Sequence, residues 1–219
     1  CPFLGGLMTA FLSRARTFVA LFLVTSAVTF ALSTSASADQ NEVVSGSGLE
    51  SSQSSISVGD KFSCIATSAG GVKCWGLNNY GQLGQGATGN LGDGAGEMAT
   101  LPEISLDGSA VSITVGTSHV CAVLESGSLK CWGRNAEGQL GLGDTLDRGD
   151  GASEMGSALP EVSVSGAAFP RTVLAAAAGN GHTCALLNTH IVKCWGRGTN
   201  GQLGYENNTT LGDGSSEMG

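Results

Sequence analysis

The chain has 219 residues, of which 41% are hydrophobic and 13% are charged, and its formal net charge is −8 at pH 7. This composition excludes an intrinsically disordered chain, and the excess of acidic residues argues against DNA, RNA or an anionic lipid surface as a partner. The 35 glycines, which separate short apolar runs, favour an all-β protein.

The first 38 residues differ from the rest because they contain no aspartate or glutamate. Arg14 and Arg16 precede an apolar run over residues 17–32, and small residues follow up to Ala38. A basic start, a short apolar stretch and a small-residue end are typical of a secretory signal peptide. The alternative is a membrane anchor, but the run is shorter than the roughly 20 apolar residues that span a bilayer.

We therefore expect a signal peptide over residues 8–38, cleaved before Asp39, with residues 1–7 as an upstream remnant. The exported chain would be secreted, periplasmic or held at the cell surface, with no membrane contact after cleavage. Disulfides persist in such compartments. Residues 39–55 are rich in serine and glycine, which predicts a flexible linker. An alternative is that part of this segment adds a strand to the last unit of a closed ring.

The remaining residues, 56–219, contain three copies of one unit. Several separate motifs recur at the same offsets, which is not expected by chance. The motifs are Cys-Trp-Gly from Cys74, Cys131 and Cys194, Gly-Gln-Leu-Gly from Gly81, Gly138 and Gly201, Gly-Asp-Gly from Gly92, Gly149 and Gly212, and Glu-Met from Glu97, Glu154 and Glu217. We assign the first unit to about 56–108, the second to 109–166 and the third to 167–219, the last of them incomplete.

Each unit has the pattern of short strands. In the second unit, residues 109–115 alternate polar and apolar side chains, and two short apolar runs follow over 119–124 and 128–132. A fourth short run, 161–164, follows a glycine-rich acidic loop. Four antiparallel strands in roughly 60 residues are the size of one β-propeller blade.

The second unit contains the pattern Gly-x-x-His-x-Cys-Ala-Val-Leu, followed by Cys-Trp-Gly-Arg-Asn-x-x-Gly-Gln-Leu-Gly, and the other units repeat most of it. This pattern resembles the repeat of the regulator of chromosome condensation family. The residues that carry the resemblance are Gly116, His119, Ala122, Leu124, Trp132, Gly133, Gly138, Gln139, Leu140 and Gly141. The resemblance covers about residues 56–219 and implies a seven-bladed β-propeller. Three units are fewer than seven, so it also implies an exported, bacterial-type member of which this chain is a fragment.

Six of the seven cysteines form three pairs at one spacing. If Glu125-Ser126-Gly127 is a three-residue hairpin loop, Cys121 faces Cys131, and the last loop position favours a left-handed residue such as Gly127. The same count places Cys64 opposite Cys74 and Cys184 opposite Cys194. In the third hairpin His190 takes the position of the glycine, which histidine tolerates better than most residues.

Three interpretations of these cysteines compete. Three disulfides within the units are favoured by the even count, the fixed spacing and the export signal. A buried reduced pair is the second interpretation. The third is a metal site made of His119, Cys121 and Cys131. The first unit has Phe62 in place of the histidine, and a metal site repeated by design should not lose a ligand, so we expect no metal and no cofactor.

Other conspicuous residues have structural explanations. Trp75, Trp132 and Trp195 recur in register and are expected to pack between blades. Gly81, Gly138 and Gly201 begin tight turns, and no phosphate-loop pattern is present. His119 and His182 are expected to form hydrogen bonds in the core or between blades. The acidic loops, with Asp144, Asp147, Asp150 and Glu154 in the second unit, are expected to be solvated, and Ca²⁺ binding stays an alternative although the EF-hand pattern is absent.

These observations predict an exported β-propeller that binds a protein partner, as a scaffold or an inhibitor-like module, and is not an enzyme. In a repeat protein, a binding site should appear where the copies disagree. The candidate partner-binding residues are Asp144, Asp147 and Arg148 in one loop, Phe169 and Arg171 between the second and third units, and Tyr205 in the last loop. One alternative is a guanine nucleotide exchange factor for a small GTPase, and another is a propeller that binds or acts on polysaccharide.

Overall fold

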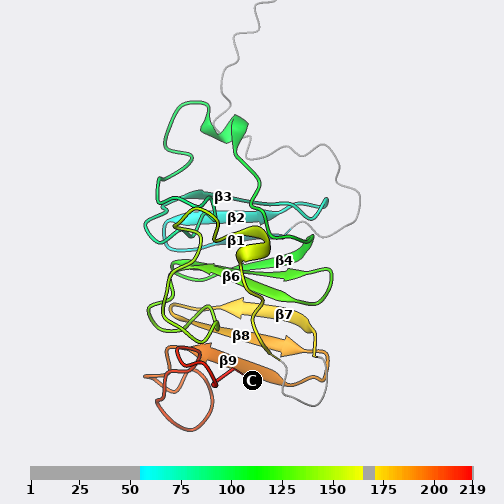
Figure 1. Cartoon of the computed structure of the whole chain (residues 1–219), viewed down its shortest axis with the longest axis vertical. Coiled ribbons are helices and arrows are strands. Elements are labelled where there is room, and N and C mark those ends of the chain that lie inside the picture. Colours follow the sequence, from blue (N-terminus) through cyan, green and yellow to red (C-terminus); the bar gives the residue numbers. More distant parts are fainter. Residues whose placement is uncertain (1–54, 165–170, 219) are drawn as a thin grey trace, which may run out of the picture. The chain divides into compact units, whose positions relative to one another are not determined.

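The computed structural model describes residues 55–164 and 171–218, and the predicted signal peptide and most of the predicted linker lie outside them. The chain divides into two units of contact, Cys1–Gln40 and Asn41–Gly219, and all described residues belong to the latter. No helix in the described ranges is long and apolar enough to cross a membrane. The described chain is instead built from short antiparallel strands (Figure 1).

The strands form three separate sheets of three strands each, one for every repeat unit. The first sheet contains β1 (Ser55–Val58), β2 (Phe62–Ala66) and β3 (Val72–Gly76). The second contains β4 (Ala110–Val115), β5 (His119–Leu124) and β6 (Leu129–Gly133). The third contains β7 (Val173–Ala178), β8 (His182–Leu187) and β9 (Val192–Gly196). The first two units also have single 3-10 turns, η1 (Glu97–Thr100) and η2 (Gly156–Ala158).

The predicted all-β class is confirmed, but the predicted fourth strand does not form in the described residues. The fourth run of the first unit meets β3 at one bridge, between Ile104 and Val72, and that of the second unit meets β6 at one bridge, between Glu161 and Lys130. Pro102 and Pro160 directly precede these runs. A proline has no backbone N–H, so it cannot extend the ladder beyond the bridge.

The hairpins have the predicted register. Cys64 lies opposite Cys74, Cys121 opposite Cys131 and Cys184 opposite Cys194. Gly127 has φ 82° and His190 has φ 63°, so the last position of each loop is left-handed, including the one that has no glycine. The three-residue loop therefore fixes which residues face each other, as the sequence predicted.

Two apolar clusters lie between neighbouring sheets. Trp132 belongs to the cluster between the first and second sheets, and Trp195 to the one between the second and third. Both indoles are fully buried. The Trp132 Nε1–H donates to the Gln82 carbonyl at 3.1 Å, and the Trp195 Nε1–H donates to the Gln139 carbonyl at 3.0 Å. Each unit is thus fixed to the preceding one by packing and by an indole hydrogen bond.

Candidate functional site

The loop after β6 is held by one buried side chain, Asn135, which is wholly inaccessible to solvent. Its Nδ2 donates to the Asp144 carbonyl at 2.8 Å, and its Oδ1 accepts from the Leu140 N–H at 2.9 Å. The Asn135 backbone N–H donates to Asp147 Oδ1 at 2.7 Å. Three bonds from one residue to both arms of the loop fix its path without any regular secondary structure.

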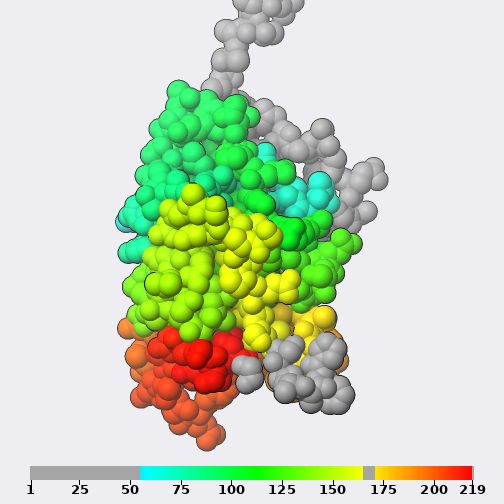
Figure 2. Space-filling model, viewed as in Figure 1, coloured from blue at the N-terminus to red at the C-terminus, as the bar shows by residue number. Residues whose placement is uncertain are grey.

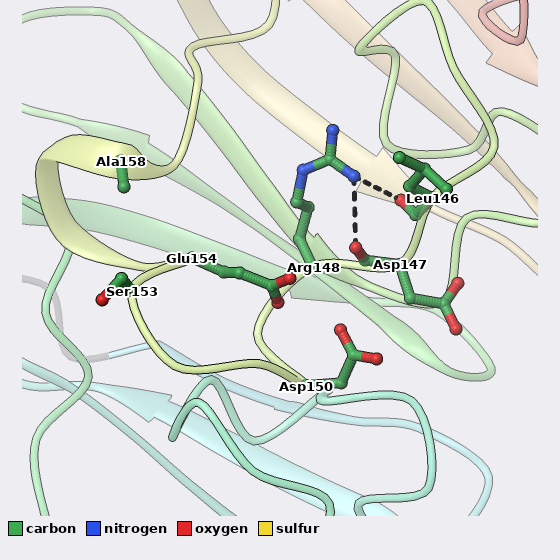
Figure 3. A pocket seen from close by; sticks show the side chains of 7 residues that line it. All are labelled: Leu146, Asp147, Arg148, Asp150, Ser153, Glu154 and Ala158. Atoms are coloured by element: carbon green, nitrogen blue, oxygen red, sulfur yellow. Dashed lines mark hydrogen bonds between the residues drawn. The ribbon is translucent and has the colours of Figure 1, made fainter.

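An ion pair orders the tip of this loop. Arg148 Nη2 lies 2.6 Å from Asp144 Oδ2, and Arg148 Nη1 donates to the Leu146 and Asp147 carbonyls at 2.7 and 3.1 Å (Figure 3). Partial burial opposes ionisation of Asp144, but hydrogen bonds from Arg148 and from the Leu146 N–H outweigh it and hold the pKa of Asp144 below its usual range. The pair is therefore ionised at neutral pH, and the guanidinium is turned back onto its own loop.

The descending arm of the loop is closed by Glu154. Its Oε2 accepts the Gly149 and Gly151 N–H groups, each at 2.9 Å. Glu97 and Glu217 make the same two contacts with Gly92 and Gly94 and with Gly212 and Gly214 in the other units. The recurring Gly-Asp-Gly and Glu-Met motifs are thus the two halves of one loop closure.

A proton is shared unequally within this closure. Burial, together with a hydrogen bond to Glu154, raises the pKa of Asp150. Burial opposes ionisation of Glu154, but bonds from the Gly151 N–H and from Asp150 lower the pKa of Glu154. Glu154 is consequently the ionised partner. Among the described residues, no group of three or more histidine, cysteine, aspartate or glutamate side chains could hold a metal ion.

The loop borders a hollow of about 350 Å³ on the surface of the second unit. Its lining residues are Leu146, Asp147, Arg148, Asp150, Ser153, Glu154 and Ala158 (Figure 3). Figure 2 shows this part of the chain, in yellow-green and yellow, on the surface of the face in view. Leu146 is 66% exposed although it is a large apolar side chain. The site therefore combines an exposed apolar tip with a rigid, charged wall.

The structure brings together only some of the predicted binding residues. Asp144, Asp147 and Arg148 lie in the loop just described. Tyr205 lies elsewhere, and its hydroxyl donates to the Cys194 carbonyl and accepts from the Cys194 N–H, both at 3.1 Å. Arg171 lines a second hollow, of about 330 Å³. Phe169 lies outside the described residues.

Sequence reasoning missed Leu146, Asn135 and the role of Glu154. Leu146 had a usable signal, because an apolar residue at the tip of an acidic, glycine-rich loop is out of place. Asn135 also had one, because Asn78 occupies the same position in the first unit, where it donates to the Ala87 and Gly89 carbonyls at 2.7 and 2.9 Å. In the third unit that position is Gly198, so the last loop lacks this anchor.

The cysteines and histidines lie away from this loop. The three cysteine pairs are at disulfide distance, with Cα atoms 4.1, 4.1 and 4.0 Å apart. His119 is not directed at Cys121 or Cys131, because its Nε2 lies 2.9 Å from Thr183 Oγ1 in the third unit. The arrangement proposed for a metal site is therefore not formed, and His119 has the between-unit hydrogen bond that was the structural alternative.

Comparison with known proteins identifies the repeat. Two family models described as regulator of chromosome condensation (RCC1) repeat match the chain, one at residues 54–82, 110–139 and 173–202 and the other at 126–186. These matches coincide with the first strands, hairpins and Gly-Gln-Leu-Gly turns of the three units.

Similar proteins include the ultraviolet-B receptor UVR8 of Arabidopsis thaliana, 35% identical over 140 residues, which are 63% of this chain and 28% of the receptor. The X-linked retinitis pigmentosa GTPase regulator of Canis lupus familiaris is 30% identical over 156 residues, 71% of this chain and 14% of that protein. The crystal structure of Prp20p from Saccharomyces cerevisiae has a TM-score of 0.52 and 22% identity, over 72% of this chain and 36% of that one. The chain thus spans about a third or less of these proteins.

Proposed function

Because the chain belongs to the regulator of chromosome condensation (RCC1) repeat family, we propose that it is an exported β-propeller module that binds another protein and performs no catalysis itself. The partner is a protein rather than a nucleic acid or a membrane, in keeping with the net charge of −8. Its most conspicuous residues, the tryptophans, cysteines and turn glycines, serve the scaffold. The binding function belongs to loops that differ between the units.

The observation that carries this proposal is the exposure of Leu146 on an ordered loop. Leu146 is 66% exposed, while the loop around it is fixed by Asn135, by the Asp144–Arg148 pair and by Glu154. An apolar side chain on a preorganised loop loses little conformational entropy on binding. The corresponding positions of the other units, Gly89 and Asn208, carry no comparable apolar side chain.

The surroundings of Leu146 indicate what the partner presents. An apolar pocket on the partner would receive the leucine. A cationic side chain would fit the hollow beside it, because Asp147, Asp150 and Glu154 supply three carboxyl groups and Arg148 is occupied by Asp144. A buried apolar anchor with a charged rim is the usual composition of a protein interface.

Export is the part of the proposal that the cysteines support. All six cysteines in the described residues form pairs at disulfide distance. Such pairs are stable as disulfides in oxidising compartments and are rare in reducing ones. A secreted, periplasmic or cell-surface location therefore suits the chain.

A small GTPase is the second candidate partner. The observation that favours it is the 30% identity to a protein whose name describes a GTPase regulator. Loading small GTPases with a fluorescent guanine nucleotide and measuring nucleotide release with and without the chain tests this alternative. Accelerated release would replace the scaffold proposal with an exchange activity.

The binding proposal is tested by site-specific cross-linking. A photo-activated amino acid replaces Leu146 in one variant and Thr88, an exposed residue of the corresponding loop in the first unit, in a matched control. Both variants are irradiated in the medium or compartment into which the chain is expressed. We expect a discrete protein adduct at position 146 that is absent at position 88. Identical adducts at both positions, or none, would contradict the proposed site.

A further inference from the structure

The two internal contacts between repeat units follow one hydrogen-bonding plan. In each contact the tryptophan of the later unit donates to a glutamine carbonyl of the earlier one, Trp132 to Gln82 and Trp195 to Gln139. The later unit also covers the Gly-Gln-Leu-Gly turn of the earlier one. A Cβ on Gly138, for example, would lie 2.5 Å from the Asp213 backbone nitrogen.

The two contacts differ at one pair of positions. Between the second and third units, His119 Nε2 lies 2.9 Å from Thr183 Oγ1, and that hydroxyl donates to the Gln139 carbonyl at 2.9 Å. Between the first and second units, Phe62 and Val120 occupy the same two positions, and both are buried. A histidine is thus matched with a hydroxyl, and a phenylalanine with a valine.

The third unit has an outer face with the features of the earlier unit in such a contact. His182 corresponds to His119, and Gln202 to Gln139. Both are half-buried, whereas His119 and Gln139 are buried at 0% and 1% exposure. A Cβ on Gly201 or Gly204 would meet no atom within 4 Å, so this turn is open where those of the other units are covered.

The first unit has the opposite face, with the features of the later unit in a contact. Ile56 and Val58 are 64% and 66% exposed, while Ile113 and Val115, which correspond to them in the second unit, are 9% and 7% exposed. Trp75 is half-buried, unlike the other two tryptophans. Its face therefore leaves apolar surface uncovered that the internal contacts cover.

We infer that these two open faces are complementary halves of a third contact of the same kind, and that copies of this chain associate head to tail through them. Ser63 occupies the position of Thr183 and so supplies the hydroxyl that His182 requires. Trp75 would donate to the Gln202 carbonyl, as Trp132 and Trp195 donate within the chain. A second copy is the occupant because both residue pairs match the histidine–hydroxyl type of contact, and neither would match Phe62 or Val120.

A contact between two different faces of identical chains is heterologous, and it adds copies until a ring closes. The defined observable is therefore mass. Analytical ultracentrifugation or light scattering of the whole 219-residue chain across a dilution series should show a concentration-dependent species of at least twice the monomer mass. A monomer mass at every concentration would overturn the inference.

Substitutions at the matched positions test the contact itself. Ser63→Val should weaken association roughly 10- to 100-fold, because it leaves a buried histidine without its hydrogen-bond partner. Adding His182→Phe converts the contact to the phenylalanine–valine type found between the first two units and should restore association. Thr88→Val is the matched control at an exposed hydroxyl and should leave association unchanged. Association that Ser63→Val does not affect, or that the double variant does not recover, would overturn the proposed contact.

Discussion

His119 Nε2 lies 2.9 Å from Thr183 Oγ1 in a wholly buried contact between β5 and β8. Because Thr183 donates its own proton to the Gln139 carbonyl, His119 must be the donor at Nε2. Its Nδ1 is then a bare acceptor, and it has no hydrogen-bond partner in residues 55–164 and 171–218. Burial, with a smaller contribution from His182, lowers the pKa of His119 to about 4.

This depressed pKa predicts acid lability of the chain. The unfolded state takes up a proton at His119 below about pH 6.5, whereas the folded state does so only near pH 4. The stabilising contribution is therefore complete above pH 6.5 and is lost progressively as the pH falls to 4, by about 3 kcal/mol in total. Urea unfolding at several values between pH 7.5 and 4 measures this loss. A free energy of unfolding that stays constant over that range would contradict the buried neutral histidine.

A double substitution should remove that pH dependence. His119→Phe with Thr183→Val reproduces the contact that Phe62 and Val120 form between the first two units, and the Gln139 carbonyl keeps its bond from Trp195. Replacing both partners by apolar groups is close to neutral at pH 7, whereas Thr183→Val alone orphans a buried donor and costs about 1–3 kcal/mol. Equal destabilisation by the single and double variants would show that the two residues do not act as a pair.

The fold could be predicted where a repeated local pattern determined it. Three copies of a loop of known length were sufficient to place Cys121 opposite Cys131 and to predict the left-handed residue at His190. The fourth strand failed because Pro102 and Pro160 prevent the ladder from extending, a local effect that the run of alternating residues did not reveal. The boundaries of β5 were predicted without error, while β4 and β6 each begin one residue later than expected.

The candidate site was predicted only in outline. Disagreement between copies pointed to the loop with Asp144, Asp147 and Arg148, because a copy that breaks the pattern is not explained by the scaffold. It could not separate residues that form the loop from residues that are displayed on it. Asn135 and Glu154 resemble ordinary polar repeat residues in sequence, and only their hydrogen bonds show that they hold Leu146 in place.

The cysteine pairs predict a measurable contribution to stability. Each would close a short loop in the unfolded chain, and removing one pair, as in Cys121→Ser with Cys131→Ser, should cost about 2–3 kcal/mol. Mass spectrometry after alkylation without reductant should find these six cysteines unmodified. Alkylation of all six would show that they are reduced.

Removing the loop closure should disorder the candidate site. Glu154→Ala deletes the acceptor for the Gly149 and Gly151 N–H groups, so those two amides should exchange with solvent faster and the cross-link from position 146 should weaken. The partly exposed carboxylate makes the cost to global stability about 1–2 kcal/mol. Glu206→Ala, at an exposed residue of the third unit, is the control and should leave both amides protected. Unchanged exchange in the Glu154 variant would show that the loop is ordered by other contacts.

Two glycines of the same turn allow the packing between units to be measured separately from backbone strain. Gly138 and Gly201 have φ of 69° and 73°, so Gly138→Ala and Gly201→Ala share a cost of about 1–2 kcal/mol for the left-handed conformation. Only Gly138 is covered by the next unit, with the Asp213 backbone nitrogen 2.5 Å from the added Cβ, so its alanine variant should lose about 1–3 kcal/mol more in dilute solution. Equal losses would mean that the units pack too loosely to resist a methyl group. In concentrated solution, Gly201→Ala should also impair head-to-tail association, because a second copy would cover Gly201 as the third unit covers Gly138.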